Sequence, residues 1–419
     1  MKKIIKKFLA VITAAAIIPN YVCLCSAAAE SEEKKLIALT FDDGPNTTTT
    51  NEILDILEEY DAKASFFLIG NNINDESAVS VKRAYDMGME INNHSKTHSN
   101  MSKMTAEELQ AEISYVDEKV NEIIGENTKF FRPPFIDVSQ SMYDSIDLPF
   151  ICGIDCKDYM DNVSAQDRAD FILNGAKDGV IVLLHDAAGN SKTVEALEIV
   201  MPQLIEQGYE FVTLTELFER QGETPKGNIL YSNVAKYPCS NYSLYEEIPI
   251  EATDRIALDV NMHETLGDTY AVELEYESAT GYPPVIALQK WSSTPSVWHT
   301  IQPFYFNGER AVFLAEDISS ALNQLELSSS ELDGISVTAY SGDITFKKAE
   351  ILVESDEEKT TVRGDVNADG KFNATDITLF SKWLLVVPDT NVDDLNAADM
   401  SEDGILNIFD LCIMKRELQ

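Results

Sequence analysis

Between residues 35 and 220, short apolar runs alternate with longer amphipathic stretches, and this alternation limits the possible folds more than any other feature of the chain. Repeated strand–helix alternation favours a parallel sheet that is closed or nearly closed into a barrel. Thr105 and Glu108 form a capping box that marks the start of one helix. The predicted strands are 36–41, 64–69, 90–93, 129–132, 150–155, 180–185 and 210–213, and the predicted helices are 51–60, 106–124 and 194–207.

Polar residues that could carry chemistry fall at or just past the ends of these strands. The carboxyl ends of parallel strands meet at one end of a barrel, where barrel enzymes place their active sites. Two adjacent carboxylates are costly to bury unless a metal or a proton separates their roles, and two histidines four residues apart can face one ion. The pattern predicts a divalent metal on one carboxylate and two histidines, with the second carboxylate free to act as a base. The candidates are Asp42, Asp43, His94, His98, Arg132, Asp155 and His185.

The N-terminus has the features of a secretory signal peptide, residues 1–29. Four lysines among the first seven residues precede an apolar stretch at 8–18, and small residues follow. This apolar core is too short to span a bilayer, and no later segment reaches the roughly 18 apolar residues that a spanning helix needs. The formal net charge of −39 repels nucleic acid and anionic membranes. The four cysteines beyond the leader show no CxxC spacing, so we expect a secreted, extracellular protein without a disulfide framework.

A second region, residues 229–353, changes to period-two alternation and is flanked by polar linkers at 221–228 and 354–361. Seven strand-like runs separated by turn residues predict a β-sandwich. The predicted strands are 256–260, 270–276, 285–291, 300–306, 311–314, 335–340 and 344–353, with a short helix at 318–325.

The last segment, residues 362–419, contains a loop that occurs twice. Residues 365–376 and 399–410 carry oxygen-bearing side chains at loop positions 1, 3, 5, 9 and 12, with glycine at position 6. This pattern is typical of a calcium loop, in which position 7 contributes a backbone carbonyl. Two copies in register, leading into apolar helices at 377–385 and 411–418, predict two Ca²⁺ sites. The predicted ligands are Asp365, Asn367, Asp369, Lys371 and Asp376 in the first loop, and Asp399, Ser401, Asp403, Ile405 and Asp410 in the second.

Five ordered motifs make residues 35–218 resemble the polysaccharide deacetylases of carbohydrate esterase family 4. The motifs are TFDDGP at 40–45, HSKTH at 94–98, FRPPF at 131–135, DCKDY at 155–159 and LLH at 183–185. The family fold is a distorted (β/α) barrel, in agreement with the strand–helix alternation. We expect the deacetylase domain to span residues 30–220.

The resemblance implies a role for each candidate in the metal site and in proton transfer. Asp43, His94 and His98 would bind zinc or another divalent metal. Asp42 would be the general base, and Arg132 would orient it. His185 would be the general acid, and Asp155 would tune it.

The resemblance also implies a substrate groove. Phe135 would supply an oxyanion N–H, Tyr159 would form part of the groove wall, and Leu183 would line the pocket for the acetyl methyl. Two positions depart from the family pattern: Tyr159 stands where a tryptophan is usual, and Ile136 stands where a glycine is usual. Both departures leave the preferred sugar open.

The C-terminal repeat resembles a type I dockerin, which implies a cohesin of a scaffoldin as its partner. The middle region resembles a carbohydrate-binding module, because exposed aromatic rings stack on sugars and Trp291, Trp298, Tyr282 and Tyr305 cluster in its sequence. The alternative is that both tryptophans belong to the core of the sandwich.

These resemblances predict a secreted cellulosomal acetylxylan esterase that hydrolyses O-acetyl groups of plant cell-wall xylan. One alternative is an N-deacetylase of chitin oligomers or peptidoglycan. The other is a non-catalytic wall-binding subunit of the cellulosome.

Overall fold

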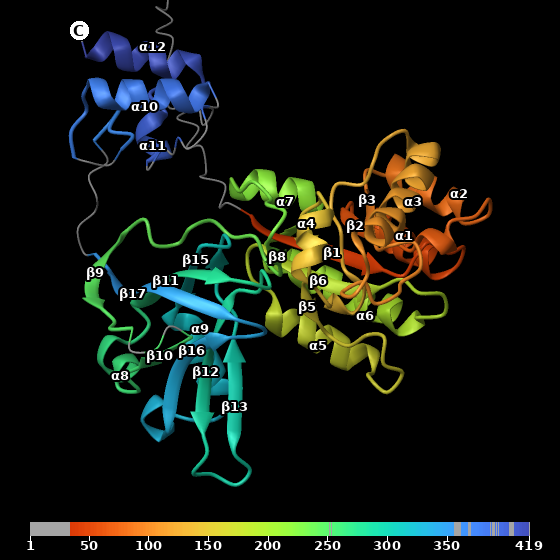
Figure 1. The fold of residues 1–419 in the computed structure, drawn as a ribbon, viewed down its shortest axis with the longest axis horizontal. Helices are drawn as coiled ribbons and strands as arrows, with labels where there is room; N and C mark the ends of the chain where they lie inside the picture. Colours follow the sequence, from red (N-terminus) through yellow and green to blue (C-terminus); the bar gives the residue numbers. More distant parts are fainter. Residues whose placement is uncertain are drawn as a thin grey trace, which may run out of the picture. The chain divides into compact units, whose positions relative to one another are not determined.

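Figure 1 shows the fold in a computed structural model. The structure describes residues 34–250, 252, 254–355, 362–367, 370–385, 387, 390, 392, 394–401 and 406–418. The predicted signal peptide, residues 356–361 of the second linker and the calcium-ligand candidates Asp369, Asp403 and Ile405 lie outside these residues. Within the described part of the chain, we find no helix with the length and apolar character needed to cross a membrane.

A parallel sheet forms the centre of the first region, and its apolar strands are buried on both faces as such sheets require. Its strands are β1 (Lys35–Asp42), β2 (Ala64–Leu68), β3 (Glu90–Asn93), β5 (Ile154–Asp155), β6 (Val180–His185) and β7 (Tyr209–Phe211). The strand order is β3-β2-β1-β6-β5, and β7 pairs with the first residues of β1. Because β1 is central, the residues at its carboxyl end have strand neighbours on both sides.

Short pairings extend this sheet beyond its main strands and partly close it into a barrel. Phe131 forms parallel bridges with Asn93 and Phe150, and β4 (Phe150–Ile151) pairs with β8 (Leu230–Tyr231). The strand predicted at 129–132 is therefore reduced to one bridging residue. The strand predicted at 150–155 is broken into β4 and β5 at Gly153, where a Cβ atom would lie 3.0 Å from a backbone carbonyl of β6. The result is the predicted distorted barrel.

Helices cover the outside of this sheet (Figure 1). At the predicted capping box, Thr105 accepts a hydrogen bond from the backbone N–H of Glu108, and the Glu108 carboxylate accepts one in return. The helices are α1 (Thr49–Glu59), α2 (Ala78–Asp86), α3 (Ala106–Ile124), α4 (Gln140–Ser145), α5 (Ala165–Gly175), α6 (Ser191–Glu206) and α7 (Leu214–Gln221). The helices predicted at 51–60, 106–124 and 194–207 are confirmed as α1, α3 and α6, with ends that differ by at most three residues.

The middle region contains two antiparallel sheets with the strand orders β10-β16-β12-β13 and β14-β15-β11-β17-β9. The strand predicted at 300–306 is wrong, because the chain leaves one sheet after β13, passes Pro303 and enters the other sheet at β14. The strands are β9 (Tyr242–Glu247), β10 (Arg255–Leu258), β11 (Tyr270–Ser278), β12 (Pro284–Lys290), β13 (Val297–Ile301), β14 (Tyr305–Phe306), β15 (Arg310–Leu314), β16 (Gly334–Ala339) and β17 (Ile344–Glu354), and the helices are α8 (Met262–Leu266) and α9 (Ala315–Gln324).

The first region and the middle region share one hydrophobic core within the compact unit formed by residues 35–419. This cluster contains Ala38 and Ile181 from the parallel sheet together with Val272 and Ile286 from the two antiparallel sheets. The deacetylase-like region is therefore packed directly against the residues that follow it.

The C-terminal region contains α10 (Ala374–Leu384), α11 (Leu395–Ala398) and α12 (Ile408–Glu417). The helices α10 and α12 start three residues earlier than predicted, because Asn373 and Asn407 act as N-caps and form capping boxes with Asp376 and Asp410.

Candidate active site and metal site

Three side chains converge just past the carboxyl ends of β1 and β3. Asp43 follows β1, His94 follows β3, and His98 ends a turn in which its N–H donates to the Ser95 hydroxyl at 3.0 Å. Asp43 Oδ1 lies 3.6 Å from His94 Nε2 and 3.5 Å from His98 Nε2. The three donor atoms all lie within 4.8 Å of one another. The structure thus brings together the three residues predicted as metal ligands, whose role stays a prediction.

The backbone around these donors is strained. Asp43, Ser95 and His98 have φ angles of 75°, 67° and 56°, in the left-handed region that non-glycine residues rarely adopt. Such conformations cost about 1–3 kcal/mol each and persist where surrounding contacts enforce them, most often at functional sites.

The donor set fits a divalent metal. Asp43 Oδ1 is buried and has no hydrogen-bond partner among the described residues. His94 Nδ1 lies 2.7 Å from the carbonyl oxygen of Arg132 and donates to it, which leaves the lone pair of Nε2 directed at Asp43. Burial lowers the pKa of His94 although Asp42 and Asp43 oppose this, and the neutral imidazole is the form that binds a metal. One carboxylate and two imidazoles suit zinc and similar ions and leave positions open for water or substrate.

Asp42 is held beside this metal site by a buried ion pair. It is 2% exposed, and its Oδ1 accepts a hydrogen bond of 2.6 Å from Nη1 of the fully buried Arg132. Burial disfavours the carboxylate, but the charges of Arg132, His94 and His185 outweigh this and lower the pKa of Asp42. The second oxygen, Oδ2, lies 3.7 Å from His94 Nε2. Asp42 is therefore ionised, with one oxygen fixed by Arg132 and the other facing the metal donors.

His185 lies opposite Asp42 in the parallel register of β1 and β6. Its Nδ1 donates to Asp158 Oδ1 at 2.6 Å, and its backbone N–H donates to Asp158 Oδ2 at 2.8 Å. Burial disfavours the charged imidazole, but the hydrogen bond and charge of Asp158, with Asp42 and Asp43, raise the pKa of His185 to about 9. With Nδ1 engaged by Asp158, a proton on Nε2 is available for transfer.

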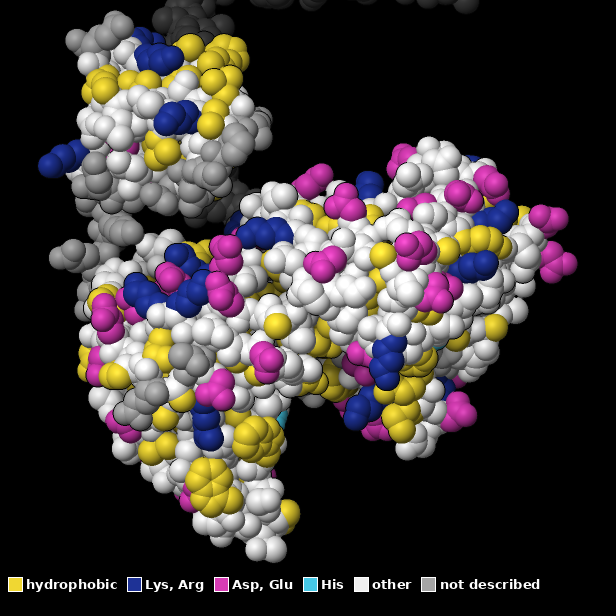
Figure 2. Space-filling model, in the orientation of Figure 1, with side chains coloured by type: hydrophobic (Ala, Val, Ile, Leu, Met, Phe, Trp, Pro, Cys, Tyr) yellow, Lys and Arg dark blue, Asp and Glu magenta, His cyan; other side chains and the backbone are white. Residues whose placement is uncertain are grey.

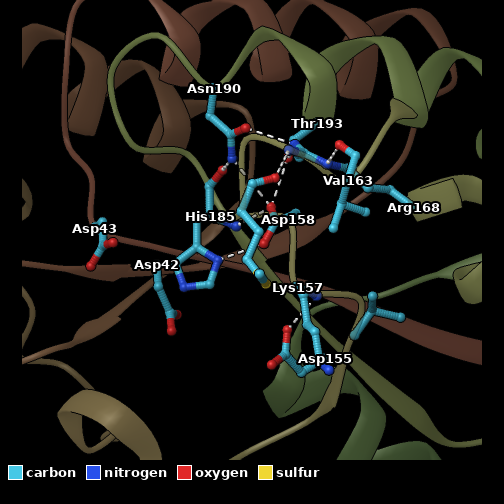
Figure 3. A network of polar contacts seen from close by, with 12 residues as sticks. Asp42, Asp43, Asp155, Lys157, Asp158, Val163, Arg168, His185, Asn190 and Thr193 are labelled. Carbon is cyan, nitrogen blue, oxygen red and sulfur yellow. Dashed lines mark hydrogen bonds and ion pairs between the residues drawn. The ribbon is translucent and has the colours of Figure 1, made fainter. Parts of the chain in front are cut away.

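The expectation that Asp155 tunes His185 is corrected by these contacts. The Asp155 carboxylate accepts the backbone N–H of Lys157 at 2.6 Å, and Figure 3 shows no dashed line between it and His185. Lys157 has a φ of 56°, and this left-handed turn brings Asp158 rather than Asp155 to the histidine. The assignment therefore moves from Asp155 to Asp158.

Two residues that support Asp158 were not predicted. The Thr193 hydroxyl donates to Asp158 Oδ2 at 2.7 Å, and the Asn190 side-chain amide approaches the same oxygen at 3.3 Å (Figure 3). Both lie at the start of α6, outside the five motifs, so only the location of Asn190 and Thr193 shortly after His185 could have suggested them.

Two exposed aromatic rings flank the site. Phe135, which is 66% exposed, packs edge-to-face on His98 with ring centroids 4.8 Å apart. Tyr159, which is 59% exposed, packs in the same way on His185 at 5.5 Å. Leu183 is buried on β6, opposite Thr40 of β1. The substrate-binding roles predicted for Phe135, Tyr159 and Leu183 stay predictions.

In the C-terminal repeat, the last residue of each loop occupies an equivalent position. The Asp376 carboxylate is buried and accepts backbone N–H groups of Val366 and Asn373, at 3.1 and 2.8 Å. The Asp410 carboxylate is buried and accepts those of Ser401 and Asn407, both at 2.9 Å. The described parts of the two loops therefore fold alike.

The aromatic residues of the middle region separate into two kinds. Trp291 and Trp298 are 61% and 64% exposed, so the alternative that they form the core is wrong. Figure 2 shows hydrophobic side chains gathered near the hairpin that connects β12 and β13, at the bottom of the view in Figure 1. Tyr305 is buried, and Tyr282 is half-buried against the deacetylase-like region, so neither forms part of an exposed platform.

Two family models match parts of the chain. The polysaccharide deacetylase family model matches residues 29–147, and the type I dockerin model matches residues 363–419. A bifunctional xylanase/deacetylase of Pseudobutyrivibrio xylanivorans is 47% identical over 205 residues, which are 49% of this chain and 34% of that protein. A peptidoglycan-N-acetylglucosamine deacetylase of Listeria monocytogenes is 34% identical over 190 residues, 45% of this chain and 40% of that protein. The chain thus spans about a third to two fifths of the length of these two relatives.

Two solved structures are similar to about half of the chain. The Xyl-CE4 domain of a multidomain xylanase from the hindgut metagenome of Trinervitermes trinervoides is 46% identical, with 48% of this chain and 98% of that chain covered and a TM-score of 0.47. A family 4 acetyl xylan esterase from Clostridium thermocellum, in complex with a cobalt ion, is 39% identical, with 48% and 99% covered and a TM-score of 0.47.

A further relative is covered over most of its own length. It is a peptidoglycan-N-acetylglucosamine deacetylase of Bacillus cereus, 34% identical over 197 residues, which are 44% of this chain and 88% of that protein. The chain therefore belongs to the polysaccharide deacetylase family, carbohydrate esterase family 4, and carries a type I dockerin at its C-terminus.

Proposed function

We propose that this chain is a secreted, cellulosomal, metal-dependent deacetylase that hydrolyses O-acetyl esters of xylan. One observation carries the proposal: an ionised carboxylate and a histidine with a raised pKa face each other from neighbouring strands, beside three converging metal donors. A base, an acid and a Lewis-acid site within one small area are the groups that acyl hydrolysis needs.

Each residue has a definite task in this reaction. A divalent ion on Asp43, His94 and His98 would polarise the acetyl carbonyl and acidify a water. Asp42 takes the proton of the attacking water on the oxygen that Arg132 leaves free. His185 delivers the Nε2 proton to the departing sugar oxygen, and Asp158 stabilises the charged imidazole until then.

The remaining groups position the acetyl group. The backbone N–H of Phe135 donates to the oxyanion, and the exposed rings of Phe135 and Tyr159 border the sugar on the two sides of the site. Leu183 contributes an apolar surface for the acetyl methyl.

Xylan is the favoured substrate for three reasons. The P. xylanivorans relative is named a xylanase/deacetylase, a dockerin accompanies plant-wall hydrolases, and an ester releases a better leaving group than an amide. We expect acetate release from acetylxylan to exceed that from chitin oligomers by at least ~100-fold, about 2.7 kcal/mol of barrier, and to stop with a chelator. Comparable rates, or faster release from the chitin oligomers, would overturn the xylan assignment.

N-deacetylation is the second candidate, because the relatives of L. monocytogenes and B. cereus are named peptidoglycan-N-acetylglucosamine deacetylases. The side-by-side assay distinguishes it from the first. A non-catalytic wall-binding role predicts no acetate from either substrate, and the complete set of acid, base and metal donors argues against that role.

We infer that the two antiparallel sheets are the layers of a β-sandwich that binds polysaccharide through Trp291 and Trp298. Trp298 pairs with Gln289 in the β12–β13 register, and Gln289 pairs with Gly334 in the β12–β16 register. A Cβ on Gly334 would lie 3.3 Å from the Trp291 ring, so the glycine makes room for that ring. Arg255 donates to Gln289 at 3.1 Å, which places polar groups beside the two rings.

The dockerin is proposed to fold around two Ca²⁺ ions and to bind a cohesin of a scaffoldin. Ile408 and Phe409, at loop positions 10 and 11 of the second copy, are 58% and 71% exposed. The equivalent residues of the first copy are Ala374 and Thr375, so the two potential docking faces differ in chemistry.

A further inference from the structure

The loop that carries Phe135 has an unusual backbone. In the 3₁₀ turn Pro134–Ile136, Phe135 has φ 61° and Ile136 has φ 53°. A bulky or β-branched residue in the left-handed region is a genuine outlier, because its side chain crowds its own backbone. Two such residues in succession need contacts from outside the turn to hold them.

One set of contacts comes from the segment that follows the metal ligand His98. The Asn100 side-chain amide and the Ser102 hydroxyl both donate to Asp137 Oδ2, at 2.6 and 2.8 Å. These bonds fix the carboxyl side of the turn, but they do not reach the carbonyl of Ile136.

The second contact comes from the middle region. Tyr282, in the connection between β11 and β12, donates its hydroxyl to the carbonyl oxygen of Ile136 at 2.7 Å. Its ring packs with Ile136 and Tyr143 against a core cluster of the deacetylase region that includes Met142 and Phe150. Burial raises the pKa of Tyr282, so its hydroxyl remains a donor over the whole working pH range.

The same connection is attached at a second point. The Tyr143 hydroxyl donates to the carbonyl of Thr280 at 2.7 Å, and the backbone N–H of Leu230 donates to the carbonyl of Gly281 at 3.3 Å. The two residues that precede Tyr282 thus make hydrogen bonds of their own, separate from the bond to Ile136.

We propose that Tyr282 is a positioning residue of the deacetylase site: its hydroxyl holds Ile136 in the left-handed conformation and thereby aims the Phe135 N–H at the oxyanion. The inference rests on the proposed deacetylase function. It gives the middle region a part in the reaction that is separate from any binding of polysaccharide. It also explains how the turn tolerates isoleucine, since an outside hydrogen bond stabilises a conformation that glycine would adopt unaided.

The test is a set of matched Tyr→Phe variants of the full chain, assayed for acetate release. Tyr282→Phe should lower kcat about 10-fold with little change in KM, since one net hydrogen bond corresponds to up to about a tenfold shift in the population of the competent turn. Tyr143→Phe removes an equally short bond at the same interface but keeps the hydrogen bond to Ile136, and it should leave kcat within about 2-fold. Equal losses in both variants would indicate a merely structural interface and would overturn the proposal.

Rescue gives a second readout. In an Ile136→Gly background the left-handed conformation carries no side-chain penalty at position 136, so adding Tyr282→Phe should cost less than about 2-fold. The same tenfold loss in both backgrounds would refute the mechanism.

Amide hydrogen exchange of residues 135–138 provides a readout that does not depend on activity. Exchange should be faster in Tyr282→Phe than in Tyr143→Phe, and equal exchange in the two variants would overturn the inference. A wild-type chain that releases no acetate would refute the proposed function, and the exchange comparison would still decide whether Tyr282 holds the turn.

Discussion

Replacing Asp158 with asparagine should shift the alkaline limb of the pH profile of kcat/KM to lower pH. His185 acts as an acid and must be protonated, so activity falls as pH rises through its pKa. That pKa is raised to about 9, and Asp158 contacts both Nδ1 and the backbone N–H of the histidine. Without the carboxylate charge, burial of the imidazole dominates and lowers the pKa.

The size of the shift follows from the contact. A hydrogen bond to a charged group is worth about 1.5–3 kcal/mol, and one pKa unit corresponds to about 1.36 kcal/mol. The alkaline limb should therefore move down by about 1 to 2 units. Activity at pH 9 should fall about 5- to 50-fold, while activity near pH 6, where the histidine is charged in both proteins, should change about 3-fold or less. A metal bound to Asp43 would weaken that residue's influence on His185 but would leave the direct contact with Asp158 in place.

The assay is acetate release from acetylxylan between pH 5 and pH 10, with Asp155→Asn as the matched control. Asp155 undergoes the same chemical change three residues away, and its carboxylate binds Lys157 instead of His185. An unmoved alkaline limb in Asp158→Asn, or an equal shift in Asp155→Asn, would refute the assignment of Asp158.

Three further predictions concern the metal, the dockerin and the sugar-binding surface. Asp42→Asn should abolish turnover but keep the metal, whereas His98→Ala should lose it, because two remaining protein ligands hold zinc poorly; elemental mass spectrometry checks both, and metal loss from the Asp42 variant would contradict its role as base. Residues 362–419 should gain helical circular dichroism only when calcium is added, since so small a segment has little core and its acidic loops repel themselves when empty; a helical spectrum in chelator would count against the two calcium sites. Trp291→Ala and Trp298→Ala should each weaken binding to insoluble xylan by about 1–2 kcal/mol in pull-down isotherms while leaving acetate release from short soluble substrates unchanged, and unaltered binding in both variants would exclude this surface.

The sequence predicted the barrel strands and the metal donors because both depend on short-range patterns. An apolar strand ending in two carboxylates places them at the sheet edge whatever the rest of the chain does, and β1 ends at Asp42 as that reasoning requires. The helices α5 and α7 were missed although Ser164 with Asp167 and Thr213 with Glu216 form capping boxes that were present in the sequence.

What the sequence did not provide depends on loop geometry and on distant contacts. Asp155 and Asp158 lie in an irregular turn, where no periodicity tells which carboxylate faces β6, and the φ angle of Lys157 decides the matter. Tyr282 meets a residue 146 positions away, and its sequence context showed only that an aromatic ring was available.

The shared hydrophobic core limits where the chain of this enzyme can be cut and joined to another protein. Cutting the chain near residue 220 would remove β8, which pairs with β4, and would divide a buried cluster that runs from Leu36 to Ile351. The separated catalytic part would expose the apolar side chains that this cluster now buries. Transfer of this catalytic site to another protein should therefore move residues 30–353 together, not the first 220 residues alone.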